Sequence, residues 1–246
     1  MEIREGNVKI VCFASLKGGV GKTSGAVFLA QALARRGRVL AVDIDANNNL
    51  TDYFCRDVDP AALEQANVYH VVTGRDQEEG IRGIIEHHID VLPATPMLHR
   101  AGLELARDPG SLLRFPAALR RLPYDFIVLD TPPALVLELT IGLYSADLVL
   151  GPVSFGRWTV QGFGLLRAEV ERVGQIGRTP RLLALPSIVT EKEDEGLRAL
   201  NSWIPTRSTI IKSAAVRTAG TRGRALREGT RSWEDFERLA REVVNG

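Results

Sequence analysis

Cysteine and histidine are scarce in this sequence of 246 residues. The two cysteines, Cys12 and Cys55, form no C-x-x-C pair, which argues against a disulfide framework, an iron–sulfur cluster and a role in metal delivery. Of the four histidines, His87 and His88 are adjacent, and adjacent residues point to different faces of a helix. A metal ion shared by these histidines is therefore not expected.

Long apolar runs and an excess of one charge are also missing. Glu138 and Asp147 interrupt the longest apolar stretch, and because a membrane-spanning helix needs about 18 apolar residues, none is expected. The apolar run that begins at Val8 is too short for a secretory signal, so we expect a cytoplasmic protein. The formal net charge is only +1, so a preference for nucleic acid or membrane must come from a local patch.

The overall composition is that of an ordinary globular chain, with 45% hydrophobic and 25% charged residues. The length suits one well-buried α/β domain and is too short for two large ones. We therefore predict a single domain over residues 1–246.

A glycine-rich stretch, Lys17-Gly18-Gly19-Val20-Gly21-Lys22-Thr23, stands between an apolar run and a helical pattern. Its three glycines allow a tight turn with N–H groups aimed inward, and the helix N-terminus behind them adds partial positive charge, so the loop favours phosphate oxygens. Lys22 suits a β- or γ-phosphate, and the Thr23 hydroxyl suits Mg²⁺. The alternative is a glycine-rich turn with incidental lysines.

A β-α-β unit follows from the hydrophobic pattern. A helix is predicted from Thr23 to about Arg36, and residues 39–43 form an apolar strand that ends in an acid, as in a buried parallel sheet. Because ligands bind at the carboxyl ends of such strands, carboxylates in the segment 43–49 can reach the ligand of the phosphate loop. For Asp45, the alternative is a helix N-cap for residues 49–53.

A second strand with an acid at its tip is predicted over residues 124–130. Asp130 ends this strand, where a P-loop protein needs a group to hold the Mg²⁺ shell. Pro132 and Pro133 restrict the chain that follows, so we expect a stiff segment that senses the γ-phosphate.

Three motifs together resemble one family of proteins. They are K-G-G-V-G-K-T at 17–23, Y-D-x₄-D-T-P-P at 124–133 and A-D-x₄-P at 146–152. This pattern resembles the ParA/MinD family of P-loop ATPases, whose deviant Walker A loop has the extra lysine found here as Lys17. The resemblance covers roughly residues 8–244 and implies a ParA-type partition ATPase with an α/β, single-domain P-loop NTPase fold: a mostly parallel twisted sheet with helices on both faces.

The resemblance also implies ligands and roles for particular residues. ATP and Mg²⁺ are the expected ligands, Lys17 reaches the nucleotide of a second subunit, and Asp45 positions or activates the attacking water. Thr23 and, through water, Asp130 hold the metal, and the adenine lies near Ile204 and Pro205. The catalytic set is then Lys17, Lys22, Asp45 and Asp130, and the ATP contacts are Lys17, Gly18, Gly19, Val20, Gly21, Lys22, Thr23, Ser24 and Pro205.

One loop departs from the family pattern. The family reads Asp-x-Asp-Pro-Gln-Gly-Asn after the second strand, and here Ala46, Asn47 and Asn48 replace Pro-Gln-Gly. The resemblance therefore does not extend to the shape of this loop.

The remaining pattern is simpler. Helices are predicted at 60–66, 68–73 and 78–87, with a strand at 89–93. Gly162 is expected to open a helix whose pattern covers 165–173, and Pro186 indicates a bend or an edge in the strand 182–189. The run 191–194 is one residue from a guanine-reading motif, and we interpret it as a solvated acidic turn.

A basic segment runs from Pro205 to Arg231, with seven bases against one acid. Such a patch neutralises nucleic-acid phosphates without regard to sequence. ParA-type ATPases bind non-specific DNA through this part of the dimer, and the alternative is a solvated arginine-rich surface. The candidate DNA contacts are Arg207, Lys212, Arg217, Arg222 and Arg224.

The last helix is expected to begin at Ser232 in capping-box style, with an apolar stripe from Trp233 to Val243. Its four acids against two arginines favour docking on the core over binding to anionic lipid, so no membrane partner is expected. The family implies a homodimer in the ATP state, a cargo-bound ParB-like adaptor and a nucleoid-associated location. The alternatives are a cargo-positioning ATPase that does not use DNA and a P-loop metabolic ligase.

Overall fold

The computed structural model of the chain describes residues 8–75, 89–105, 108, 110–199 and 205–246. The helix predicted at 78–87 and the adenine candidate Ile204 lie outside the described residues.

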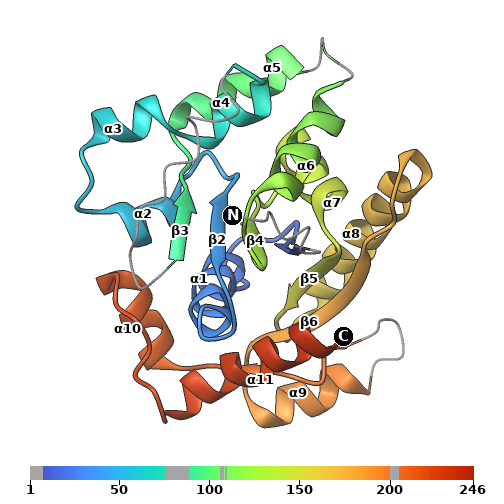
Figure 1. Cartoon of the computed structure of the whole chain (residues 1–246). Coiled ribbons are helices and arrows are strands. Elements are labelled where there is room, and N and C mark those ends of the chain that lie inside the picture. The colour runs from blue at the N-terminus through green and yellow to red at the C-terminus, as the bar shows by residue number, and fades with distance from the viewer. Residues whose placement is uncertain (1–7, 76–88, 106–107, 109, 200–204) are drawn as a thin grey trace.

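A parallel sheet forms the centre of the molecule (Figure 1). It has seven strands in the order β3-β2-β4-β1-β5-β6-β7, and every strand pairing in the described part of the chain is parallel. The predicted fold class is thus confirmed. The strands are β1 Lys9–Phe13, β2 Val39–Asp43, β3 Ile89–Leu92, β4 Phe126–Asp130, β5 Leu148–Val153, β6 Arg181–Val189 and β7 Ile210–Ile211.

Helices cover both faces of the sheet, and each face has its own hydrophobic cluster. One face packs against α1 Lys22–Leu33, α2 Asn49–Cys55, α10 Ala214–Arg222 and α11 Arg231–Asn245. The other packs against α4 Val68–Thr73, η1 Pro96–Arg100, α5 Ala101–Leu105, α6 Ser111–Arg121, α7 Leu137–Ser145, α8 Arg157–Ile176 and α9 Glu191–Arg198. A short helix, α3 Pro60–Gln65, has no buried residue.

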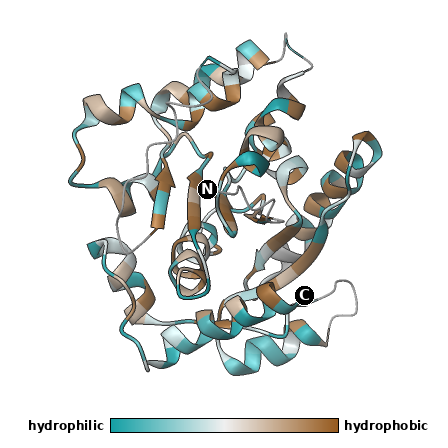
Figure 2. Cartoon of the chain, in the orientation of Figure 1, coloured by the Kyte–Doolittle hydropathy of each residue, from teal (hydrophilic) through white to brown (hydrophobic). Residues whose placement is uncertain are grey.

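The alternation of side chains along a strand divides the core between the two faces. In β1, Ile10 and Cys12 belong to one cluster, whereas Val11 and Phe13 belong to the other. Figure 2 shows hydrophobic residues concentrated on the central strands and both kinds of residue on the outer helices. The apolar stripe of α11 docks on α1, where the rings of Phe236 and Phe28 lie 5.4 Å apart. The prediction that the last helix docks on the core is therefore confirmed.

Two predicted helix starts were wrong. Helix α8 begins at Arg157, and Gly162 lies inside it, because Gly156 with φ +155° supplies the turn before the helix. Helix α11 has Thr230 at its N-cap, whose hydroxyl accepts from the N–H of Trp233, so Ser232 lies in the first turn.

The region around β6 also corrects the sequence interpretation. Strand β6 lies between β5 and β7, so Pro186 does not mark an edge; a register shift falls beside it, between Ser187 and Val189. The acidic run 191–194 forms the first turn of α9, capped by Thr190, because a capping box stabilises the helix start.

In the described part of the chain, no helix is both long enough and apolar enough to cross a membrane.

Candidate active site

The glycine-rich loop connects the carboxyl end of β1 to the start of α1, near the centre of the sheet. Gly19 and Gly21 have φ values of +75° and +92°, which residues with a side chain rarely adopt. A Cβ atom on Gly21 would also lie 2.9 Å from Oγ of Ser187. Backbone geometry and the close approach of β6 therefore require glycine at position 21.

Lys22 turns back into this loop. It is only 7% exposed, and its ammonium group donates to the carbonyl oxygen of Lys17 at 3.5 Å. Burial lowers the pKa of Lys22, while the nearby carboxylates of Asp130 and Asp45 oppose that shift. Lys17 is half-buried, and its backbone N–H donates to Oγ of Ser15 at 3.2 Å. The loop thus holds a buried cation beside backbone N–H groups, an arrangement that suits phosphate oxygens.

Asp130 ends β4 next to β1 and β2, opposite Phe13 and Asp43 in register. Burial raises the pKa of Asp130 to about 8, the negative charge of Asp43 adds to the rise, and a hydrogen bond from the Thr23 side chain opposes it. Its Oδ1 atom is buried and has no hydrogen-bond partner among the residues that the structure describes. A buried carboxylate with an unused oxygen beside a threonine hydroxyl is a set of ligands that fits a hard divalent cation or its water.

Asp45 lies just beyond β2 and is 7% exposed. Its Oδ1 accepts from the backbone and side-chain nitrogens of Asn47, each at 3.0 Å. The N-cap of α2 is Asn48, so the helix-cap alternative for Asp45 is wrong.

The loop that departs from the family pattern has a left-handed residue. Asn48 has φ +49° and ψ +34°, a conformation that glycine adopts freely and that asparagine tolerates better than most residues. Asn48 stands where the family has glycine, so the same backbone conformation is available without that glycine.

Asp43 is a residue to which the sequence pattern assigns no role of its own. It is completely buried, and burial raises its pKa to about 6. Its two oxygens accept hydrogen bonds from Thr51 and from the backbone of Asp45. The D-x-D sequence at the end of β2, which places Asp43 two residues before Asp45, is the sequence feature that could have indicated a role for Asp43.

Two cavities lie beside these residues. One, of about 480 Å³, adjoins Gly21 and Ser24 and is bounded by the end of β6, by β7 and by α10. Pro205 does not line this cavity; it forms a bridge with Ala184 inside β6.

The second cavity has a volume of about 570 Å³, and Asp45 is one of the residues that line it. Pro132, Pro133, His99 and Glu138 also line it. Burial raises the pKa of Glu138, and His99 opposes that rise. The segment that contains Pro132 and Pro133 therefore borders the space next to the carboxylate of Asp45.

The candidate DNA contacts are all exposed but do not form one patch. Lys212 and Arg217 line the cavity beside Gly21, and Arg222 and Arg224 lie at or just beyond the end of α10. Arg207 lies elsewhere, since its N–H donates to Glu242 of α11 at 2.8 Å.

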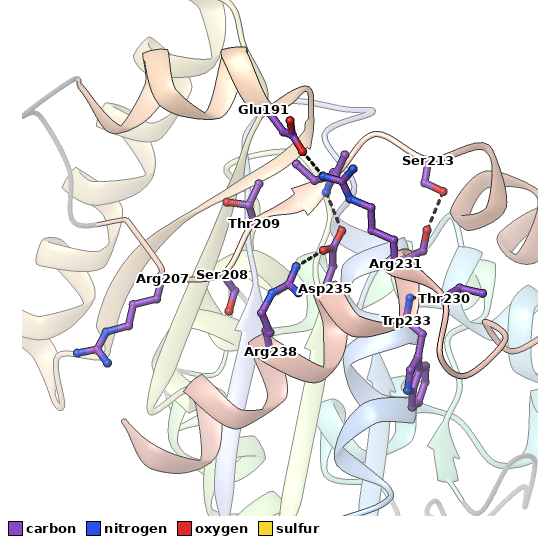
Figure 3. Close-up of polar contacts among 12 residues, drawn as sticks. Glu191, Arg207, Ser208, Thr209, Ser213, Thr230, Arg231, Trp233, Asp235 and Arg238 are labelled. Carbon is purple, nitrogen blue, oxygen red and sulfur yellow. Dashed lines mark hydrogen bonds and ion pairs between the residues drawn. The ribbon is translucent and has the colours of Figure 1, made fainter.

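Figure 3 shows the surroundings of Arg207 and of α11. The side chain of Arg207 points away from Arg231, whose guanidinium is paired with Glu191. Arg207 instead shares a groove with Arg181, Arg238 and Arg241. The structure thus divides the basic segment into two separate surfaces.

The chain is similar to known ATPases of chromosome partitioning. The AAA domain family matches residues 8–180. Chromosome-partitioning ATPase Soj of Thermus thermophilus is 37% identical over 193 residues, which are 78% of this chain and 73% of the relative. Sporulation initiation inhibitor protein Soj of Bacillus subtilis is 34% identical over 168 residues, which are 67% of this chain and 66% of the relative.

A solved structure shares the fold. The ATP complex of a variant of Cyanothece McdA, in which one aspartate is replaced by alanine, superposes with a TM-score of 0.85 over 98% of this chain and 97% of that one, at 21% identity.

Proposed function

This chain belongs to the ParA family of partition ATPases, and we propose that it works as an ATP-controlled switch that positions DNA or another cargo. As a member of this family the chain hydrolyses ATP, and Mg²⁺ is its proposed cofactor. The observation that carries the proposal is the cluster at the carboxyl end of the sheet, where Lys22 and Thr23 lie beside Asp130.

The phosphates of ATP are bound by the glycine-rich loop. The N–H groups of residues 18–24 surround the phosphate oxygens, and the ammonium of Lys22 exchanges its weak 3.5 Å contact with a carbonyl for a charged oxygen. The nucleoside extends toward the cavity beside Gly21 and Ser24. Pro205 stays a predicted contact of the adenine.

The magnesium ion would be held by the hydroxyl of Thr23 and, through water, by Asp130. An ion held there would supply positive charge that offsets the negative charge of the ATP phosphates. The unpartnered Oδ1 of Asp130 and the hydrogen bond from Thr23 support this assignment. Because the pKa of Asp130 is raised to about 8, this carboxyl group would release a proton at neutral pH when it accepts a hydrogen bond from metal-bound water.

Asp45 orients the attacking water. Asn47 holds one of its oxygens through two hydrogen bonds, and the second cavity leaves space next to the carboxylate. Fixing a water in line with the γ-phosphate is the main task of such a group, since phosphoryl transfer depends on positioning and charge stabilisation.

Dimer formation connects hydrolysis to cargo. Two subunits close face to face, and each Lys17 neutralises charge on the nucleotide of the other subunit. Hydrolysis then separates the dimer. A cargo-bound ParB-like adaptor is the proposed partner, and the proposed location is cytoplasmic and nucleoid-associated.

Non-specific DNA binds through the surface of α10. Lys212 and Arg217 border the cavity proposed for the nucleoside, and Arg222 and Arg224 extend the same surface. Nucleotide and DNA would therefore contact neighbouring parts of one helix. Arg207 is a DNA candidate only on the separate groove next to α11.

A cargo-positioning ATPase that does not use DNA is the second candidate. The division of the basic segment favours it, because Arg207 lies in a separate groove and Arg231 is paired with Glu191, which leaves a smaller patch around α10 than the seven bases of the sequence suggest. Each phosphate contact adds to DNA affinity, so fewer contacts mean weaker binding.

DNA binding with ATP, with ADP and across a salt series separates these candidates. We expect random duplex DNA to bind in ATP and to weaken as salt rises, with a slope of about −0.9 per phosphate contact. Arg217→Glu combined with Arg222→Glu should weaken binding and spare nucleotide binding, whereas Arg167→Glu on α8 serves as the control. A DNA affinity that is the same with ATP and with ADP, or that does not change with salt, would favour the DNA-independent function.

A further inference from the structure

The backbone of Asp45 is held by another carboxylate. Oδ1 of Asp43 accepts a hydrogen bond from the N–H of Asp45 at 3.1 Å. Asp43 lies at the end of β2 and is completely buried, so this contact fixes the exit of the chain from the sheet toward Asp45. The position of Asp45 therefore depends on the orientation of the carboxyl group of Asp43.

Thr51 of α2 sets that orientation. Oδ2 of Asp43 accepts from the hydroxyl of Thr51 at 2.8 Å and from its N–H at 2.9 Å. The hydroxyl oxygen of Thr51 in turn accepts from the N–H of Ala94, beyond the end of β3, at 2.8 Å. Thr51 is 2% exposed and Ala94 is 1% exposed, so water has little access to replace these bonds.

The contacts form one chain across three elements. It runs from Ala94 through Thr51 and Asp43 to Asp45, and thus joins the ends of β3 and β2 with the first turns of α2. Loss of the hydroxyl would leave the Ala94 N–H without its acceptor and would release one of the two bonds on Oδ2 of Asp43.

We propose that Thr51 is a positioning residue for ATP hydrolysis, because its hydroxyl orients Asp43, and Asp43 holds the backbone of Asp45 in place for the attacking water. This proposal rests on the proposed role of Asp45. Thr51 does not touch the substrate; it acts through two buried hydrogen bonds.

The test measures single-turnover hydrolysis of saturating Mg·ATP and, separately, the affinity for a non-hydrolysable ATP analogue. Thr51→Val keeps the side-chain shape and removes the hydroxyl, and we expect hydrolysis to fall about 10- to 100-fold with affinity changed less than about threefold. Thr51→Ser restores the hydroxyl and should restore the rate to within about threefold. Thr51→Ala replaces the valine variant if that variant does not fold.

Two further variants separate the possible failures. Ser145→Ala removes another buried hydroxyl, which donates to the carbonyl of Ile141 at the opposite end of the sheet, and should leave the rate unchanged. If Ser145→Ala slows hydrolysis as much as Thr51→Val, or if Thr51→Ser does not restore the rate, the positioning role is wrong. If Asp45→Ala abolishes hydrolysis and Thr51→Val does not slow it, only this inference fails. If Asp45→Ala hydrolyses ATP normally, the proposed function of Asp45 fails.

Discussion

Asp147 at the amino end of the sheet and Asp130 at its carboxyl end differ in how their oxygens are paired. At the amino end, Asp147 accepts from the N–H of Ile10 at 2.8 Å and pairs with the guanidinium groups of Arg120 and Arg178. At the carboxyl end, Asp130 keeps an oxygen without a partner, and its pKa is raised to about 8. A carboxylate that is hydrogen-bonded and paired with arginines stabilises the fold, whereas a buried carboxylate oxygen without a hydrogen-bond partner indicates a ligand-binding site.

Lysines at the two ends offer the largest contrast. Lys22→Ala removes the buried ammonium from the glycine-rich loop, and we expect ATP hydrolysis to fall about 100-fold or more, because a charge that stabilises the transition state is lost. Lys9→Ala, at the start of β1, removes a side chain that donates to the carbonyl of Val243 and should leave hydrolysis unchanged. Steady-state ATPase assays of both variants test this. Equal losses of hydrolysis rate in the two variants would contradict the predicted difference between the two ends of the sheet.

The acid at the amino end should matter for stability only. Asp147→Asn weakens the pairing with two arginines and should lower the free energy of unfolding by about 1–3 kcal/mol. Urea unfolding measures the loss, and ATP hydrolysis by the folded variant should remain at the wild-type rate. A variant of normal stability with slow hydrolysis would contradict the division between the two ends.

Stability of the ligand-free protein should depend on pH through the carboxyl end. Burial raises the pKa of Asp130 to about 8 and that of Asp43 to about 6, so between pH 5 and pH 8 the folded state binds more protons than the unfolded state. The free energy of unfolding should therefore fall as pH rises through this range. Asp130→Asn, whose amide does not titrate, should flatten the dependence. Thermal unfolding without nucleotide measures both, and an unchanged slope in the variant would contradict the assignment to Asp130.

The loop at Asn48 should show the smallest effect. Because Asn48 has φ +49°, Asn48→Gly should keep or slightly raise stability, while Asn48→Val should lower it by about 1–2 kcal/mol. Chemical unfolding of the two variants tests this, and a valine that costs no stability would mean that the loop adopts another conformation.

The part of the fold nearest the phosphate loop could be predicted from sequence because its strands are buried on both faces. The predicted strand 39–43 has the bounds of β2, and the acids at the ends of β2 and β4 lie together as neighbouring parallel strands require. The hydrophobic pattern of the sequence is enough to predict this region, since strand, loop and helix follow one another directly in the chain.

The basic segment could not be predicted in the same way. Its residues are close in sequence, but β7 runs from the amino toward the carboxyl side of the sheet between Arg207 and Lys212. The strand therefore carries these two side chains to different surfaces. The hydrogen bond from Ala94 to Thr51 could not be predicted from sequence either, because it depends on how α2 packs beside β3.

Proton release on nucleotide binding tests the central claim that Mg·ATP binds at the unsatisfied carboxyl end of the sheet. Calorimetric titration with Mg·ATP at pH 7, in buffers of different ionisation enthalpy, measures both the binding of Mg·ATP and the number of protons released on binding. Because the pKa of Asp130 is raised to about 8, the wild-type protein should bind Mg·ATP and release protons, and Asp130→Asn should release fewer. Failure to take up Mg·ATP, or equal proton release from both proteins, would contradict the account.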